Sequence, residues 1–349
     1  MIDGVQRVNT NNAAEAINPL APADSTPTVA AQESGWLQHF PVALFATVMG
    51  LAGLTIAWMK AFHVLGTPAV VSDLLRWVAS ATWLALSGIY LLKIARFPAA
   101  VEAERAHPVK LNFFAAISIG LLLLAVVWSP AAPALARWMW AAGAAAHLLL
   151  TLMTLSIWLF RSQFKIPQLT AAWFIPAVGN IIVPISGMQY APADVSWFFF
   201  SVGIVFWAVL MTLVLYRLFF YDPLPVKLQP TLFILIAPPA VGFLAYLALN
   251  GGQLDVFARL LYFIALFLTL LLAAQARRFL RIPFFLTAWG YSFPLAAIAI
   301  ATLEMAARSG ADFYLALGGG LLLIATLVIA ALVIKTVLAM MQGKVFVPE

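Results

Sequence analysis

Long apolar runs dominate this chain and constrain what it can fold into. Of its 349 residues, 64% are hydrophobic and only 9% are charged, whereas a soluble globular domain is about a quarter charged. A helix needs about 20 mostly apolar residues to cross a bilayer, and runs of this length recur between polar or proline-rich breaks. The sequence therefore predicts an all-α polytopic membrane protein and argues against a soluble enzyme.

Ten runs meet the length requirement for a membrane span. They cover about 40–59, 73–95, 112–129, 134–160, 170–189, 195–220, 231–249, 255–275, 284–305 and 312–340. The linkers are short, so residues 36–349 are expected to form one transmembrane domain. Residues 1–35 are rich in Asn, Ala, Pro, Ser and Thr and contain no long apolar run. Such a segment buries too little surface to fold, which predicts a disordered cytoplasmic tail.

Basic residues are divided unevenly between the two sets of linkers. With ten spans of alternating direction, 14 of the 19 Lys and Arg lie on the side of the two termini, and five lie opposite. Linkers rich in Lys and Arg stay in the cytoplasm, so both termini are predicted to be cytoplasmic. The net charge of +6 is explained by this orientation. No dense basic run with interleaved aromatic residues is present, so no nucleic-acid partner is expected.

Prolines inside the spans occur only in odd-numbered spans. They are Pro176 and Pro184 in the fifth, Pro238 and Pro239 in the seventh and Pro294 in the ninth. Proline removes a backbone hydrogen bond, and membranes tolerate this only where protein or a water-filled cavity satisfies the freed groups. The odd spans are therefore predicted to be inner helices of five hairpins around a central pore. The alternative is that proline is simply frequent in membrane helices.

The stretch "AWGYSFPLAAIAIA" in the ninth span illustrates how these breaks are expected to work. Gly290 lies four residues before Pro294 and would accept the crowding of its ring, and Asn180 lies four residues before Pro184 and would supply hydrogen bonds there. A bend at Pro294 would aim the preceding ring, Phe293, where a straight helix would not. Phe293 is therefore the candidate pore gate.

Charged groups are almost absent from the depth of the spans. Asp73, Glu304 and Asp312 lie at span ends, and His147 is the one titratable candidate at depth. We find no catalytic triad, metal-ligand spacing, phosphate loop or cysteine, so the sequence predicts neither an enzyme nor a cofactor or metal site. A path without carboxylates between basic linkers suits anions. Weak donors and narrowing rings are expected on the odd spans, at Thr47, Ser118, Asn180, Ser186 and Ser292 and at Phe45 and Phe114.

Five stretches in order carry a family resemblance. They are "FPVALFATVMGLAGL" (40–54), "HPVKLNFF" (107–114), "FIPAVGN" (174–180), "LYFIALFL" (261–268) and "AWGYSFPLAAIAIATL" (288–303). They resemble the tellurite-resistance/dicarboxylate transporter family, which includes plant guard-cell slow anion channels, bacterial TehA and fungal malate permeases. The resemblance implies a homotrimer in which the odd helices of each protomer line its own pore, with Phe293 at the occluding position. Many members have glycine where this chain has Ala46, which would restrict opening.

The leading hypothesis is a gated channel for small monovalent anions in a bacterial inner membrane. The alternatives are a proton-coupled transporter of C4-dicarboxylates such as malate, for which only His147 would supply a titratable group, and a tellurite-resistance permease. The expected partners are small anions, the lipid bilayer and copies of the same chain. Beside the gate Phe293, the candidate pore-lining or helix-kink residues are Phe45, Ala46, Gly50, Phe114, Gly120, Asn180, Pro184, Pro238, Gly242, Gly290 and Pro294.

Overall fold

The computed structural model describes residues 35–161 and 164–346, and these form a helical bundle without strands. Nearly all of the predicted tail, residues 1–34, lies outside the described residues. Within the described part, nine helices are long and apolar enough to cross a membrane, and a shorter apolar helical segment, Ala171–Gly187, occupies the place of the fifth span. The ten predicted spans are thus all present as helical segments, and the all-α membrane fold is confirmed.

Each odd-numbered span begins as a 3₁₀ helix and continues as an α-helix. Four of these spans change form once: η1 Val42–Leu44 with α2 Phe45–Leu65, η2 Lys110–Phe114 with α5 Ala115–Trp128, η6 Val226–Ile236 with α10 Ala237–Leu249, and η7 Leu286–Tyr291 with α13 Ser292–Ser309. The fifth span alternates between the two forms, as η4 Ala171–Trp173, α7 Phe174–Val178, η5 Gly179–Ile182 and α8 Pro184–Gly187.

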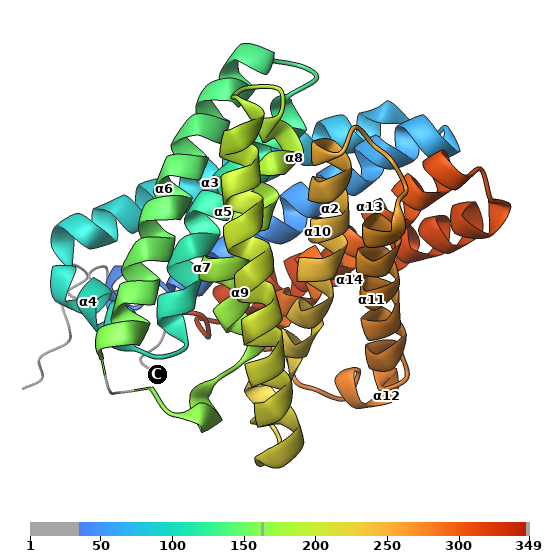
Figure 1. The fold of residues 1–349 in the computed structure, drawn as a ribbon. Coiled ribbons are helices and arrows are strands. Elements are labelled where there is room, and N and C mark those ends of the chain that lie inside the picture. Colours follow the sequence, from blue (N-terminus) through green and yellow to red (C-terminus); the bar gives the residue numbers. More distant parts are fainter. Residues whose placement is uncertain (1–34, 162–163, 347–349) are drawn as a thin grey trace, which may run out of the picture.

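The even-numbered spans are unbroken α-helices. They are α3 Ala69–Arg96, α6 Pro133–Phe160, α9 Ala193–Phe220, α11 Val256–Ala273 and α14 Asp312–Met341 (Figure 1). In the four long odd spans, 67–78% of the most apolar window is buried, against 22–33% in the even helices. In the segment 171–187, every residue except Ile185 is buried. The odd spans therefore form an inner ring that the even helices enclose. Short helices α4 Pro98–Ala106, η3 Ile166–Gln168 and α12 Ala276–Phe279 lie in the linkers.

The sequence suggested that the interior prolines kink continuous α-helices. In the structure they lie instead in the first turns of α-helical segments. Pro184 is the first residue of α8, Pro238 the second of α10, and Pro176 and Pro294 are the third residues of α7 and α13. The first turn of an α-helix has no internal partners for its N–H groups, so proline costs little there. The prolines thus stand where a 3₁₀ segment gives way to an α segment.

The glycines of the inner ring allow close helix contacts. A Cβ on Gly290 would lie 3.1 Å from the Pro230 carbonyl oxygen and 3.2 Å from the Thr231 Cα. Gly290 therefore lets η7 approach the backbone of η6, which is a different role from accepting the Pro294 ring. At Gly50, a Cβ would lie 2.6 Å from the Ser292 Cβ, so α2 and the start of α13 pack without room for a methyl group.

Side chains complete the hydrogen bonding of the broken fifth span. The Asn180 amide donates to the Ala177 carbonyl oxygen (2.9 Å) and to the Thr151 hydroxyl (3.0 Å). Thr151, on the outer helix α6, lies 2.7 Å from the Pro176 carbonyl oxygen. An unpaired buried carbonyl is costly, so the outer helix supplies a partner that the irregular inner backbone lacks.

Candidate functional site

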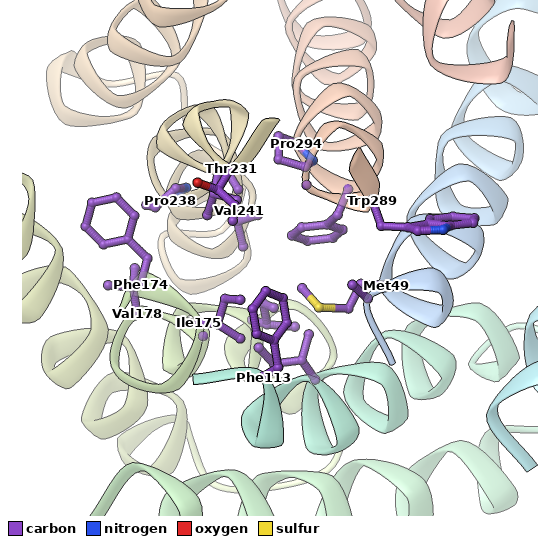
Figure 2. Close-up of a pocket in the computed structure, with 18 of the residues that line it drawn as sticks. Met49, Phe113, Phe174, Ile175, Val178, Thr231, Pro238, Val241, Trp289 and Pro294 are labelled. Atoms are coloured by element: carbon purple, nitrogen blue, oxygen red, sulfur yellow. The ribbon is translucent and has the colours of Figure 1, made fainter. Parts of the chain in front are cut away.

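Three cavities follow one another through the inner ring, and the smallest lies in the middle. This central cavity has a volume of about 70 Å³ and is lined by residues of all five odd spans. A cavity needs a volume of roughly 10–15 Å³ to hold one water molecule, so the central cavity holds only a few water molecules. Figure 2 shows Met49, Phe113, Ile175 and Val241 converging on it from different helices. The arrangement is a constriction, not an open channel.

Phe293 lies between the central cavity and the cavity on one side of it. We call this second space the Glu304 cavity, because it opens beside Glu304; its volume is about 470 Å³. Phe293 and Val241 line both spaces. The Phe293 side chain is buried, with 8% exposure, and a Cβ on Gly53 would lie 3.0 Å from its Cδ2 atom. The absence of a side chain at Gly53 therefore makes room for the Phe293 ring.

On the other side, the central cavity borders a wider basic space. This lysine cavity, of about 620 Å³, is lined by Lys110, Lys227, Lys335 and Lys344, and it shares Phe113, Leu286 and Thr287 with the central cavity. Glu104 is the one carboxylate among its described lining residues, and it pairs with Lys93 at 3.0 Å. A cleft lined mainly by one sign of charge concentrates ions of the opposite sign, so this end favours anions.

The central cavity offers no charged group and no spare side-chain hydroxyl among its described lining residues. Its two threonines both donate to the main chain, Thr231 to the Leu228 carbonyl oxygen (2.6 Å) and Thr287 to that of Lys227. None of the five expected weak donors lines this cavity. The Ser292 hydroxyl, for example, donates to the Trp289 carbonyl oxygen at 2.6 Å. An ion at this point would have to give up its water shell.

Five of the sequence candidates line the central cavity. They are Ala46, Pro238, Gly290, Phe293 and Pro294. The seventh and ninth spans therefore contribute four of these five residues.

Phe45 and Phe114 lie elsewhere, because both pack edge-on against Tyr90, with ring centroids 6.0 and 6.1 Å away. Ala46 and Phe113, the adjacent residues, take the positions at the cavity wall. The other candidates are outside the lining of the three cavities: Gly50, Gly120, Asn180, Pro184 and Gly242.

Two features of this site were not among the candidates. Phe113 stands next to the Phe114 of the "LNFF" segment, and the sequence contains no reason to prefer one ring to the other. Gly53 follows Gly50 at a spacing of three residues, which places both on one face of α2. That spacing was a usable signal, since Gly50 meets Ser292 and Gly53 meets the adjacent Phe293.

His147 lies behind the wall of the central cavity. Its side chain is fully buried, and its Nδ1 atom is 2.9 Å from the Ser118 hydroxyl. Its Nε2 atom has no hydrogen-bond partner in the part of the chain that the structure describes. A Cβ on Gly179, which lines the cavity, would lie 2.8 Å from Nε2. Among the described residues, no group of three or more His, Cys, Asp or Glu is placed to hold a metal ion.

Comparison with known proteins agrees with this architecture. Residues 39–337 match the SLAC1 family model, described as voltage-dependent anion channel. The chain is 30% identical over 313 residues to the S-type anion channel SLAH3 of Arabidopsis thaliana, covering 87% of this chain and 49% of that protein. It is 27% identical over 323 residues to the guard cell S-type anion channel SLAC1 of the same plant, covering 88% of this chain and 57% of that protein.

A bacterial relative is covered more fully. The tellurite resistance protein TehA homolog of Haemophilus influenzae is 28% identical over 267 residues, which is 74% of this chain and 79% of that protein. By contrast, the chain spans about half the length of the plant relatives. The family model nevertheless extends across nearly all of the inner and outer rings. The chain belongs to the SLAC1 voltage-dependent anion channel family.

Proposed function

We propose that this protein is a gated channel that conducts small monovalent anions, with Phe293 as the gate. The observation that carries the proposal is the position of the Phe293 ring, which lies between two cavities of the same inner ring and lines both. Hydrophobic constrictions close pores by excluding water. Movement of one ring would join the Glu304 cavity to the central cavity. The plant relatives named as S-type anion channels support the choice of ion class.

The chemistry of the path sets the expected order of permeation. The lysine cavity attracts anions, but the described residues that line the central cavity provide no charge to replace their water shell. Permeability is then governed by ease of dehydration, with nitrate above chloride and sulfate lowest. Reconstituted protein, recorded under anion substitution, tests this order. Currents carried mainly by malate or sulfate would contradict it.

We further propose a homotrimer in a bacterial inner membrane with both termini in the cytoplasm. The charge division between the linkers supports the orientation, and the lysine cavity would then face the cytoplasm. Large apolar side chains are exposed along the outer helices, such as Leu84, Leu149 and Leu327, and these suit contact with lipid or with neighbouring protomers. A reporter fused after Glu349 should be active only in the cytoplasm, and cross-linking in membranes should yield a species of three chains.

The second candidate is a proton-coupled transporter of C4-dicarboxylates, and the observation in its favour is His147. Its Nε2 atom, which has no hydrogen-bond partner among the described residues, lies behind Gly179, and Gly179 lines the central cavity. Coupling would make the reversal potential depend on a pH gradient and would be lost in His147→Gln. A channel would keep a reversal potential set by the anion alone in both proteins. The name of the TehA homolog suggests a third candidate, permeation of tellurite oxyanions through the same path.

A further inference from the structure

Charged residues of the Glu304 cavity continue the pore-facing stripes of two inner helices. On α13, the residues that line this cavity recur every three or four positions: Phe293, Ala297, Ile300, Glu304 and Arg308. On α2 they are Ile56, Met59, Lys60 and His63. Residues at these spacings share one helix face. Glu304 comes 11 residues after Phe293, or about 16 Å along the helix. The charged side chains therefore lie at one end of the Glu304 cavity, which we call its mouth, and Phe293 lies at the other end.

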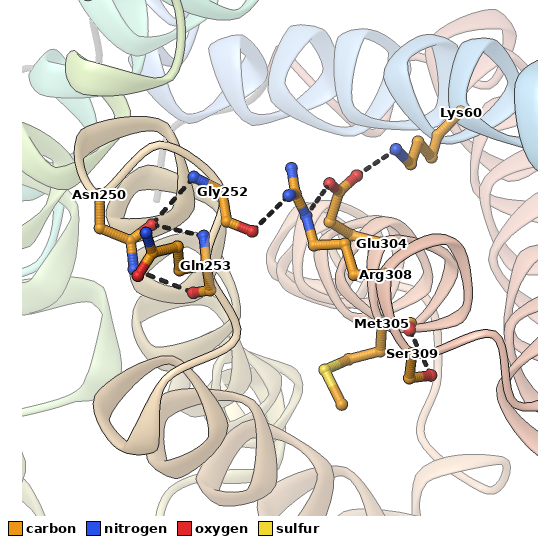
Figure 3. Close-up of polar contacts among 8 residues, drawn as sticks. All are labelled: Lys60, Asn250, Gly252, Gln253, Glu304, Met305, Arg308 and Ser309. Carbon is orange, nitrogen blue, oxygen red and sulfur yellow. Dashed lines mark hydrogen bonds and ion pairs between the residues drawn. The ribbon is translucent and has the colours of Figure 1, made fainter.

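The Glu304 carboxylate bridges the two cations at this mouth (Figure 3). Its Oε2 atom pairs with the Lys60 ammonium, and its Oε1 atom accepts a hydrogen bond from the Arg308 Nε at 2.5 Å. The three side chains are 24%, 13% and 34% exposed for Lys60, Glu304 and Arg308. They are therefore partly shielded but still within reach of ions that enter the cavity.

The linker between α10 and α11 holds Arg308 in place. Its Nη1 atom donates to the Gly252 carbonyl oxygen. The Gly252 backbone has a φ of +83°, and a Cβ there would collide with the guanidinium. Asn250 fixes this turn, because its Oδ1 atom accepts hydrogen bonds from the N–H groups of Gly252 and Gln253, both at 3.1 Å. The cation at the mouth is thus positioned by two separate elements.

We propose that Lys60 and Arg308 form an anion-binding site at this mouth, and that Glu304 is a competing anion supplied by the chain itself. The site takes planar oxyanions, such as nitrate or a small carboxylate, because a carboxylate already bridges the two cations there. This inference rests on the proposed anion channel function. Conduction requires binding that is weak enough for release. A tethered competitor weakens binding without removing the positive charge that attracts the ion.

The bridging carboxylate also has a purely structural interpretation, as a clamp between α2 and α13. The two roles predict different results when the charge of Glu304 is removed. Glu304→Gln keeps the size of the side chain but removes its negative charge. Its single accepting oxygen can keep only one of the two contacts, with Lys60 or with Arg308, so the competition for the pair ends. If Glu304 competes, anions bind more tightly in this variant. If it only clamps the helices, stability falls and anion binding is unchanged.

The experiment measures anion binding to the purified full-length chain in lipid nanodiscs. The midpoint of thermal unfolding is followed while nitrate or acetate is titrated at constant ionic strength, since a ligand that binds the folded state raises the midpoint. We expect the half-saturating concentration to fall about five-fold in Glu304→Gln, a change of roughly 1 kcal/mol. The control is Asp73→Asn, which removes a carboxylate from the Asp73–Arg76 pair (3.0 Å) at the same end of the bundle. Asp73 does not line the three cavities.

A second variant keeps the test decisive if Glu304→Gln does not fold. Lys60→Gln removes one of the two cations, and the half-saturating concentration should rise at least several-fold. Unchanged binding in the folded variant, or an equal change in Asp73→Asn, would overturn the site. Currents separate this inference from the proposed function. Tighter binding without any current supports the site and contradicts the channel, whereas normal currents with unchanged binding contradict the site alone.

Discussion

The inner spans begin as 3₁₀ helices and hold the interior prolines, whereas the outer helices run unbroken for 18 to 30 residues. Both sets are strongly apolar, so hydropathy alone does not separate them. The difference lies in what surrounds the backbone. An inner span tolerates irregular hydrogen bonding because other helices satisfy its free groups, as Thr151 of α6 does for Pro176. An outer helix faces lipid, which provides no such partner.

The largest expected effect is on anion conductance, and it is tested by comparing a phenylalanine of an inner span with a phenylalanine of an outer helix. Phe293→Ala should raise anion conductance several-fold, because it joins the Glu304 cavity to the central cavity. Phe267→Ala is the control, since Phe267 lies on α11 with 63% of its surface exposed and should leave conductance unchanged. Planar-bilayer or liposome flux recordings of both variants measure the difference.

Loss of a packed ring without a pore role would give another result. Removal of a buried phenylalanine costs about 3–5 kcal/mol of folding stability. A Phe293→Ala protein that unfolds more readily and carries no added current would show that the ring is ordinary packing.

Glycines provide the next comparison. Gly50→Ala would place a methyl group 2.6 Å from the Ser292 Cβ, and overpacking of this kind costs about 1–3 kcal/mol. Gly88→Ala, on the outer helix α3, meets no atom within 4 Å and should stabilise the helix by up to about 1 kcal/mol. Unfolding midpoints in one detergent should therefore move in opposite directions. Equal shifts of the two unfolding midpoints would contradict the proposal that glycines of the inner spans make closer contacts than those of the outer helices.

The smallest expected difference concerns two threonines. Thr151→Val removes the hydroxyl that lies 2.7 Å from the Pro176 carbonyl oxygen and that accepts one of the two Asn180 amide hydrogen bonds, at a cost of about 1–3 kcal/mol. Thr82, on α3, donates only to the Val78 carbonyl oxygen of its own helix, so Thr82→Val should change stability by less than about 0.5 kcal/mol. The free energies of unfolding of the two variants are compared by chemical denaturation. Similar losses would mean that the fifth span does not depend on α6.

The sequence predicted the spans and their inner or outer position well, because apolar length and proline position reflect the demands of the bilayer directly. The first span was placed at 40–59, but α2 extends to Leu65. Lys60 and His63 looked like the end of the apolar run, yet they line the Glu304 cavity. In α2, polar residues that face a cavity therefore continue the helix beyond its apolar run.

The choice of pore-facing residues was less predictable. Phe45 and Phe114 were expected in the path, but the residues next to them line the central cavity: Ala46, which was itself a candidate, and Phe113, which was not. A 3₁₀ helix has 3.0 residues per turn and an α-helix 3.6. Over the five residues of η2 this changes the direction of a side chain by about 100°. The apolar sequence contains no signal for where the 3₁₀ segment begins, so the face of each aromatic residue could not be assigned.

The 3₁₀ segments also explain how the shortest span can reach across a bilayer. Residues 171–187 would extend about 26 Å as an ideal α-helix, which is shorter than a hydrocarbon core of about 30 Å. The segments η4 and η5 contribute three and four residues, each with a rise of about 2.0 Å instead of 1.5 Å. The span then reaches about 29 Å. Its irregular backbone thus matches a short sequence to the thickness of the membrane, and an insertion that made it longer would be expected to displace Gly179 from the cavity wall.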